Sequence, residues 1–362
     1  LSRGLGDVYK RQGLTGLNVF NLISMSRLRY VYVICIITLI LFSCLRWERG
    51  TDWETYFAFY REFHSITING YMEPGFNLFT SINKSLVPFY TFHLTVMAII
   101  AIGCVAITIR KYSVFPFLSL LVWFSMSLCN LFPVRQTIAV AMLVYASKFI
   151  INREKKKFII ALSIAVSFHY SAIVFGIAYY LFHRCYSRRF FIVTLLIAIV
   201  IAIISENLIS SVVYSIGGEF FQEKLSYYME ANADNSFGSA YTAREVLFRG
   251  IANRSLLFII PLFFLERRRQ SDTIFNGFFN LYYFAFILFV LLVPLSPVLG
   301  RLATYYDYSQ FFIIPYFFKI PFTRKSLYVI YFIVIAYCAI RFNGVVQNYK
   351  EEYIPYKSIF SI

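Results

Sequence analysis

Charged residues are scarce in this chain of 362 residues. They make up 14% of the sequence, whereas hydrophobic residues make up 59% and aromatic residues 20%. This composition excludes an ordinary soluble domain, in which about a quarter of the residues are charged. The apolar residues gather in runs of the length that a helix needs to cross a membrane, so we predict an all-α, polytopic integral membrane protein.

The usual motifs of metal and nucleotide chemistry are missing. The sequence has no CxxC pair, no HExxH, no glycine-rich phosphate loop, no GxSxG and no Ser-x-x-Lys arrangement at a plausible site. Its six cysteines lie mostly in apolar runs, and its four histidines are scattered over different segments. We therefore expect packing cysteines, no metal site and no cofactor, and nucleotide hydrolysis would need a separate chain.

Basic residues are in excess, with a formal net charge of +16, but they form short clusters rather than one basic face, so we expect no nucleic acid partner. Arg27, Arg29 and the clusters at 110–111, 152–157, 183–189, 266–269 and 319–325 hold 17 of the 34 Lys and Arg residues. The segments 46–89, 206–249, 294–308 and 342–362 hold 14 of the 18 acidic residues. The positive-inside rule places the basic clusters in the cytoplasm and the acidic segments outside.

Apolar stretches predict about nine to ten spans in a bundle that forms a single membrane domain over 25–362, with outer loops at 46–89 and 206–249. The stretches are 29–45, 90–109, 113–132, 136–151, 158–182, 190–205, 250–265, 273–293, 309–320 and 326–341.

We expect residues 1–24 to be an artefactual or unstructured N-terminus. They lack an initiator Met and differ in composition from the rest of the chain, and Met25 is a plausible start.

One stretch, 158–182, conflicts with this topology, because the basic clusters on both of its sides favour the cytoplasm. A single span cannot satisfy both clusters. A re-entrant hairpin of two half-helices of about 11 residues, each about 16 Å long, resolves the conflict. Its turn near 167–172 would hold His169 at mid-membrane depth, facing the outer side.

Several polar residues at the predicted outer side have both a functional and a structural interpretation. Glu73 precedes Pro74, so its carboxylate is either a reacting group or a partner of the helix dipole. Arg135, followed by Gln136, begins a helix and is either a phosphate ligand or a snorkelling anchor. His169 is either a functional group inside the membrane or a hydrogen-bonded structural histidine.

A last polar group lies at another outer membrane edge. Arg301 and Tyr305 occur in "VLGRLATYYDYSQ", which is either part of a site or an aromatic belt with an arginine anchor. The segment 46–63, "RWERGTDWETYFAFYREF", carries both charge signs among aromatic rings and is either one wall of a site or a solvated interfacial loop.

Six motifs together resemble the EpsG family of Wzy-like polymerases of bacterial exopolysaccharide and O-antigen synthesis. They are "RWERGTDWETY", "EPGFNLFTSIN", "RQTIAVAMLVYA", "FHYSAIVFGIAYYL", "RLATYYDYSQFFIIP" and "YIPYKSI", in this order from Arg46 to the end of the chain. The resemblance implies functional roles for Arg49, Gly50, Thr51, Asp52, Glu73, Arg135, Gln136, His169, Arg301 and Tyr305.

The activity that the resemblance implies is glycosyl transfer at the outer face of the bacterial plasma membrane. Oligosaccharide repeats on a polyprenyl diphosphate would be joined for exopolysaccharide, capsule or O-antigen, with membrane lipid and other polysaccharide-assembly proteins as partners. Glu73, His169 and Arg135 are the expected catalytic residues, with Glu73 preferred as the base. The expected substrate-binding residues are Arg49, Asp52, Gln136, Arg301 and Tyr305.

Three other functions remain open from the residues alone. A flippase or transporter of lipid-linked oligosaccharide would also need basic residues near the diphosphate. A membrane O-acyltransferase would use His169 as its base. A scaffold in a polysaccharide-assembly complex would need no chemistry at all.

Overall fold

Every regular element in the described part of the chain is a helix. The computed structural model describes residues 25–50, 52–63, 72–127, 131–204, 242–319, 324–348 and 350–361. Within these residues there is no strand, only an isolated antiparallel bridge between Arg46 and Ser358. The all-α class is confirmed. The expectations for residues 1–24, for Thr51 and for most of the loop 206–249 lie outside the described residues.

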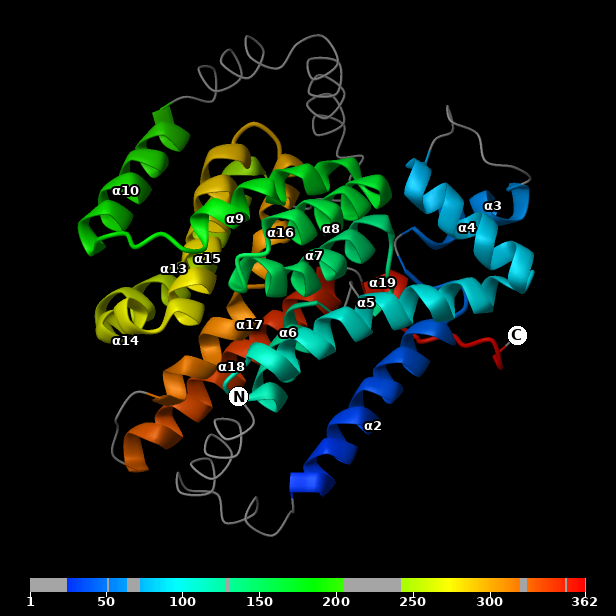
Figure 1. Ribbon diagram of the computed structural model, residues 1–362, viewed down its shortest axis with the longest axis horizontal. Helices are drawn as coiled ribbons and strands as arrows, with labels where there is room; N and C mark the ends of the chain where they lie inside the picture. Colours follow the sequence, from blue (N-terminus) through cyan, green and yellow to red (C-terminus); the bar gives the residue numbers. More distant parts are fainter. Residues whose placement is uncertain are drawn as a thin grey trace. The chain divides into compact units, whose positions relative to one another are not determined.

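The chain folds into two compact units, and their union in one membrane domain stays a prediction. The first unit comprises residues up to 149, then 156–173 and 314–362. In it α5 packs beside α2 and α4, and α6 packs on α5 and α18 (Figure 1). Its helices are α2 (Met25–Cys44), α3 (Trp53–Glu62), α4 (Pro74–Leu86), α5 (Tyr90–Tyr112), α6 (Pro116–Met126), most of α7 (Arg135–Ile151), most of α8 (Lys155–Phe168), η6 (Ile314–Lys319), α18 (Arg324–Asn348) and α19 (Lys350–Tyr353).

The second unit comprises residues 150–155 and 174–313. Its centre is α15, most of whose side chains are buried, and α10, α13, α14, η5, α16 and α17 pack against it. Its elements are part of η3 (Tyr170–Ile177), α9 (Ala178–Leu181), α10 (Arg188–Ile204), α13 (Ala243–Ile259), the π-helix η4 (Ile260–Phe264), α14 (Glu266–Ser271), α15 (Thr273–Leu292), η5 (Leu299–Ala303), α16 (Thr304–Asp307) and α17 (Gln310–Ile313).

Five helices among the described residues are long and apolar enough to cross a membrane: Arg27–Cys44, Tyr90–Tyr112, Ala243–Phe264, Thr273–Leu292 and Tyr328–Gln347. Each falls on a stretch predicted as a span. Four other predicted stretches form helices of 17 residues or fewer, α6, α7, α10 and the pair α17 and η6. At 1.5 Å per residue even the longest of these reaches only about 26 Å, short of a hydrocarbon core of about 30 Å. The count of nine to ten spans therefore stays a prediction.

The segment predicted as a hairpin does return to its starting point. The regular α-helix α8 stops before His169, and a 3-10 helix follows. Beyond it, the Tyr179 hydroxyl donates to the carbonyl of Arg153 at 3.0 Å, and His183 Nε2 donates to the carbonyl of Ile150 at 2.8 Å. The residues just before α8 and just after α9 thus meet, so the chain reverses between them. The depth of this hairpin in a membrane stays a prediction.

The C-terminal segment lies along the chain that follows α2. The Trp47 amide donates to the carbonyl of Lys357, and the Ile359 amide donates to the carbonyl of Leu45, both at 2.9 Å. Gly50, between this contact and α3, has a φ of +113°, a conformation that side chains with a Cβ rarely adopt. The motif near residue 46 and the motif at the end of the chain therefore form one structural element.

Arg46, within this element, is buried rather than solvated. The residue is 5% exposed, and its guanidinium carbon lies 4.7 Å from the centre of the Phe132 ring. Burial lowers its pKa to about 10, and one of its hydrogen bonds goes to the carbonyl of Ser43 at 3.2 Å. The mixture of charge and rings that begins at Arg46 is thus partly a packed core and not a solvated loop throughout.

Candidate active site

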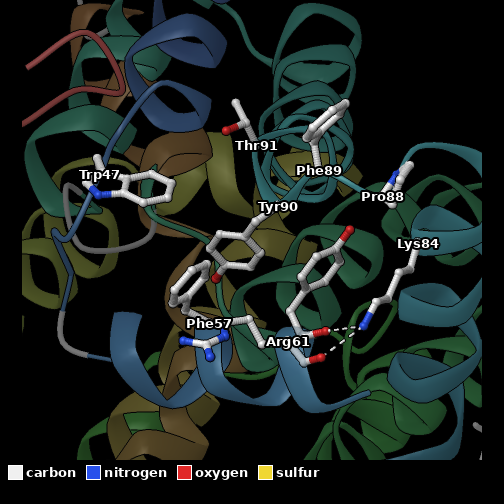
Figure 2. A pocket seen from close by; sticks show the side chains of 9 residues that line it. Trp47, Phe57, Arg61, Lys84, Pro88, Phe89, Tyr90 and Thr91 are labelled. Carbon is white, nitrogen blue, oxygen red and sulfur yellow. Dashed lines mark hydrogen bonds between the residues drawn. The ribbon is translucent and has the colours of Figure 1, made fainter. Parts of the chain in front are cut away.

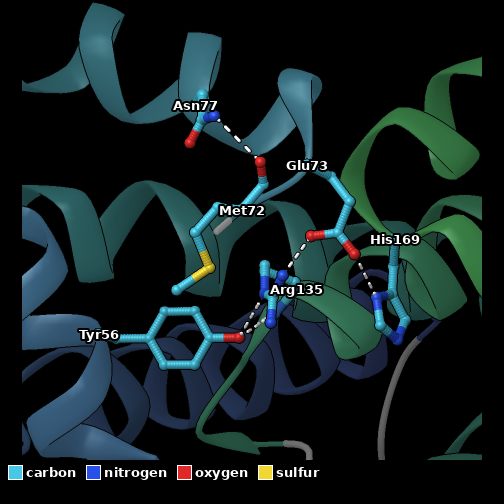
Figure 3. Close-up of polar contacts among 6 residues, drawn as sticks. All are labelled: Tyr56, Met72, Glu73, Asn77, Arg135 and His169. Carbon is cyan, nitrogen blue, oxygen red and sulfur yellow. Dashed lines mark hydrogen bonds and ion pairs between the residues drawn. The ribbon is translucent and has the colours of Figure 1, made fainter. Parts of the chain in front are cut away.

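The three predicted catalytic side chains meet in the first unit (Figure 3). Glu73 directly precedes α4, Arg135 is the first residue of α7, and His169 directly follows α8. Arg135 Nη1 donates to Glu73 Oε2, and His169 Nδ1 lies 2.8 Å from Glu73 Oε1. Each carboxylate oxygen of Glu73 therefore has its own partner, one a cation and the other an imidazole.

Glu73 does not cap its own helix. Its backbone is extended, with φ −63° and ψ 148°, as is favoured before a proline, and its side chain makes no capping hydrogen bond to α4. The carboxylate instead turns toward residues that are distant in sequence. Capping, as a structural role for this carboxylate, is therefore not what the structure shows.

A glycine lets the start of α4 approach the end of α8. A Cβ on Gly75 would overlap the side chain of Ser167 and lie 2.8 Å from its carbonyl carbon. Atoms that are not bonded to each other cannot come so close without a backbone shift. Since Gly75 and Ser167 are each two residues from a member of the Glu73–His169 pair, this close approach holds the pair together.

Replacing Gly75 by alanine is expected to separate Glu73 from His169. A displacement of about 1 Å at a reacting group can cost about 100-fold in rate, so we expect the rate of the catalysed reaction to fall by about 10-fold to 100-fold while the protein still folds. Gly103→Ala is the matched control, because no atom lies within 4 Å of a Cβ built there and alanine favours a helix. Equal rates for the two variants would show that the close approach has no part in activity.

Tyr56, a residue of α3, holds Arg135 from another side. Its hydroxyl oxygen accepts a hydrogen bond from Arg135 Nε at 2.9 Å and one from the Arg135 amide at 3.3 Å. Burial raises the pKa of Tyr56, so the hydroxyl stays protonated. Apart from the aromatic stretch in which Tyr56 lies, no sequence signal pointed to this role, because its partner is 79 residues away.

Burial and charge act in opposite directions on Glu73. Burial alone would raise the pKa of its carboxyl group, whose side chain is 6% exposed, but the hydrogen bond from His169 and the charge of Arg135 outweigh it, and the pKa is lowered. The side chains of Arg135 and His169 are 24% and 28% exposed. A substrate would therefore meet the guanidinium and the imidazole, with an ionised carboxylate behind them.

The other predicted residues of the first unit lie outside this hydrogen-bonded group. Gln136 follows Arg135 in the first turn of α7 and is half-buried. Arg49 donates to the carbonyl of Glu351 at 3.2 Å, and Asp52 is exposed at the start of α3. Substrate binding by all three residues stays a prediction.

Arg301 and Tyr305 belong to the second unit. Arg301 is exposed in η5, as a phosphate ligand would need, whereas Tyr305 in α16 is 0% exposed. Its side chain is covered in this structure, and direct substrate binding by Tyr305 stays a prediction. The burial is local, because α16 turns this residue inward among the helices that cover α15.

An ion pair that the sequence did not reveal lies in the second unit. Arg254 Nη2 of α13 donates to Asp307 Oδ2 at 2.8 Å, and Gln310 Nε2 donates to Asp307 Oδ1 at 3.2 Å. Arg254 also lies over the ring of Phe289, 3.9 Å from its centre. The pair links α13 to α16, and both carboxylate oxygens of Asp307 have a partner.

No group of three or more His, Cys, Asp and Glu side chains that could hold a metal ion lies together within the described ranges. Glu73, Arg135 and His169 bring a carboxylate, a guanidinium and an imidazole together. An imidazole held through Nδ1 leaves Nε2 for a proton, and an exposed guanidinium binds an anion.

A family model described as the EpsG family matches residues 29–358. The chain belongs to the EpsG family. The match covers nearly the whole chain and takes in Glu73, Arg135 and His169. Membership suggests a Wzy-like polysaccharide polymerase, an enzymatic role, and the EpsG assignment together with the apolar helices supports a membrane protein. Comparisons with curated proteins and with solved structures gave no match.

In this EpsG protein, motifs far apart in the sequence supply neighbouring side chains. The "EPGFN" motif gives Glu73 and Gly75, the "RQTIA" motif gives Arg135, and the "FHYSA" motif gives His169. Their meeting depends on contacts between helix ends, such as the close approach of Gly75 to Ser167. Three of the EpsG motifs thus each supply one residue to the same hydrogen-bonded group.

Proposed function

We propose that this EpsG protein is a glycosyltransferase of the bacterial plasma membrane that polymerises oligosaccharide repeats linked to polyprenyl diphosphate, at the extracytoplasmic face. The observation that carries the proposal is the group formed by Glu73, Arg135 and His169, in which one buried carboxylate holds both a base and a cation. Transfer from a diphosphate-linked sugar needs these two functions. It needs no nucleotide.

His169 is the proposed base. The carboxylate of Glu73 accepts a hydrogen bond from the Nδ1–H group of His169. The lone pair of Nε2 is then directed away from Glu73. In the reaction, Nε2 takes the proton of the acceptor hydroxyl while the hydroxyl oxygen forms a bond to the anomeric carbon of the donor sugar. The sequence alone favoured Glu73 as the base, but a carboxylate with both oxygens occupied and a lowered pKa is poorly suited to this step.

Arg135 is the proposed ligand of the leaving group. As the new glycosidic bond forms, the bond between the anomeric carbon and the diphosphate oxygen breaks, and its electron pair goes to the diphosphate. A guanidinium that is fixed by Tyr56 and Glu73 before the substrate arrives stabilises this developing charge without reorganisation. Arg135 is the first residue of α7, so the positive end of the helix dipole also stabilises the charge of the leaving diphosphate.

The rival functions use these residues less fully. An O-acyltransferase would need the pair of His169 and Glu73 but has no diphosphate to explain a preorganised Arg135. A flippase would need the cation but no base. A scaffold would need neither.

The test is elongation of polyprenyl-diphosphate-linked repeats by the purified protein in liposomes. We expect glycans longer than one repeat, together with released polyprenyl diphosphate in proportion to the bonds formed. Movement of the labelled lipid across the bilayer without elongation would replace the proposal by the flippase function. Transfer of acyl groups alone would replace it by the O-acyltransferase function.

A further inference from the structure

A cavity lined by aromatic rings opens beside α3 in the first unit (Figure 2). Its volume of about 380 Å³ lies at the lower end of the range of about 300–1,000 Å³ for small-ligand pockets. The rings of Trp47, Phe57 and Tyr90 line it, and they touch one another, with centres 5.7 Å apart for Trp47 and Phe57 and 5.1 Å apart for Phe57 and Tyr90. Such ring faces suit the C–H faces of a sugar.

Tyr60, which also lines the cavity, has an unsatisfied hydroxyl. The residue is 5% exposed, and its buried hydroxyl oxygen has no hydrogen-bond partner in the described part of the protein. A buried polar group without a partner is costly and rare in native proteins. A ligand with a hydroxyl group would supply the missing partner once the covering side chains move aside, whereas a hydrocarbon chain would leave it missing.

Lys84 at the cavity does not offer its charge to a phosphate. Its ammonium group has three protons, and its nitrogen lies 2.8 Å, 3.1 Å and 2.8 Å from the carbonyl oxygens of Tyr60, Arg61 and Phe63. Two of these bonds are drawn in Figure 2. Because all three donors are used at the end of α3, only the exposed Arg61 guanidinium remains as a polar donor from a charged residue among those that line the cavity.

The helix α3 connects this cavity to the candidate active site. Tyr56, which holds Arg135, and Tyr60, which lines the cavity, are four residues apart and lie on the same side of α3. Four residues advance a helix by about 6 Å, roughly the length of one sugar ring step along a glycan. The cavity therefore lies about one helical turn along α3 from the residue that holds Arg135.

We propose that this cavity is a saccharide subsite, which takes an internal sugar ring of the lipid-linked oligosaccharide by stacking on Trp47 and Phe57 and by a hydrogen bond to the Tyr60 hydroxyl. The proposal rests on the proposed function for the identity of the substrate. A subsite remote from the reacting bond contributes binding that is equal in the ground state and the transition state. It therefore sets affinity and not the rate of the chemical step.

Tyr60→Phe tests the subsite with the loss of one oxygen atom. The probe is the repeat-unit oligosaccharide cleaved from the polysaccharide of the host cell, free of lipid and phosphate, with binding followed by the emission of the tryptophans. We expect affinity to fall by about threefold to tenfold, the worth of one hydrogen bond, and KM for elongation to rise equally with kcat unchanged. Because the orphaned hydroxyl is removed, thermal stability without ligand should be equal or higher, which a merely structural role would not give.

The control is Tyr328→Phe, since Tyr328 is 63% exposed on α18 and lines no part of the cavity. Equal affinities of wild type and Tyr60→Phe would overturn the subsite, as would binding of inorganic diphosphate or of sugar-free polyprenyl phosphate that depends on Tyr60. Binding of the oligosaccharide does not require elongation. Tyr60-dependent binding without elongation would thus contradict the polymerase function and support the subsite. Elongation that does not depend on Tyr60 would support the polymerase function and contradict the subsite.

Discussion

Replacing Arg135 by alanine is expected to lower glycan elongation by about 100-fold to 1,000-fold, the cost of removing one preorganised group that stabilises charge in a transition state. The loss should appear in kcat, because the charge of the leaving diphosphate develops as the bond breaks. Arg135→Lys should recover only part of the rate. A lysine keeps the charge but cannot hold Tyr56 and Glu73 with separate nitrogens in one plane.

The variant at Arg135 leaves the buried carboxylate of Glu73 without its cation, so folding must be checked by thermal unfolding in the same detergent. Arg110→Ala is the matched control, because Arg110 is an exposed arginine in the last turn of α5. Elongation by folded Arg135→Ala at the rate of this control would remove Arg135 from the mechanism.

Replacing His169 by alanine should lower elongation by about 100-fold to 10,000-fold, the usual contribution of a positioned general base. Added imidazole should restore part of the rate, because a free base can enter the space of the missing ring. His169→Asn sharpens the experiment. Its amide nitrogen can replace Nδ1 as a donor to Glu73, so the local hydrogen bond is kept while the base is lost.

His169→Asn is therefore expected to fold as well as wild type and to be as slow as His169→Ala. Wild-type rates in His169→Asn would mean that the histidine only supports Glu73. A kcat unaffected by the loss of the ring in His169→Ala would point back to Glu73 as the base.

The helical class and five helices long and apolar enough to cross a membrane could be predicted from the sequence, because long apolar runs leave the backbone few alternatives in a membrane. The reversal of the chain before His183 agrees with the hairpin predicted from the two basic clusters, whose position relative to a membrane stays a prediction. The contact of the C-terminal segment with Leu45 and Trp47 could not be predicted. It is made by backbone hydrogen bonds, which carry no side-chain signature.

At the site, residue types were predictable and partners were not. Glu73, Arg135 and His169 stood out as polar residues beside or within apolar stretches. The sequence could not show that Glu73 holds the other two, because this depends on the close approach at Gly75, a contact between helices that are distant along the chain. The burial of Tyr305 could not be predicted either, because it follows from the packing of α16 against α15.

Glu73, Arg135 and His169 are proposed to act as one unit in glycosyl transfer, and a double-mutant cycle tests this most directly. Elongation in liposomes is measured for wild type, Glu73→Gln, His169→Ala and the double variant, each confirmed as folded. Because residues of one catalytic unit are strongly non-additive, we expect the double variant to be no slower than the slower single variant. Losses that multiply would show that Glu73 and His169 act independently and would contradict the proposed unit.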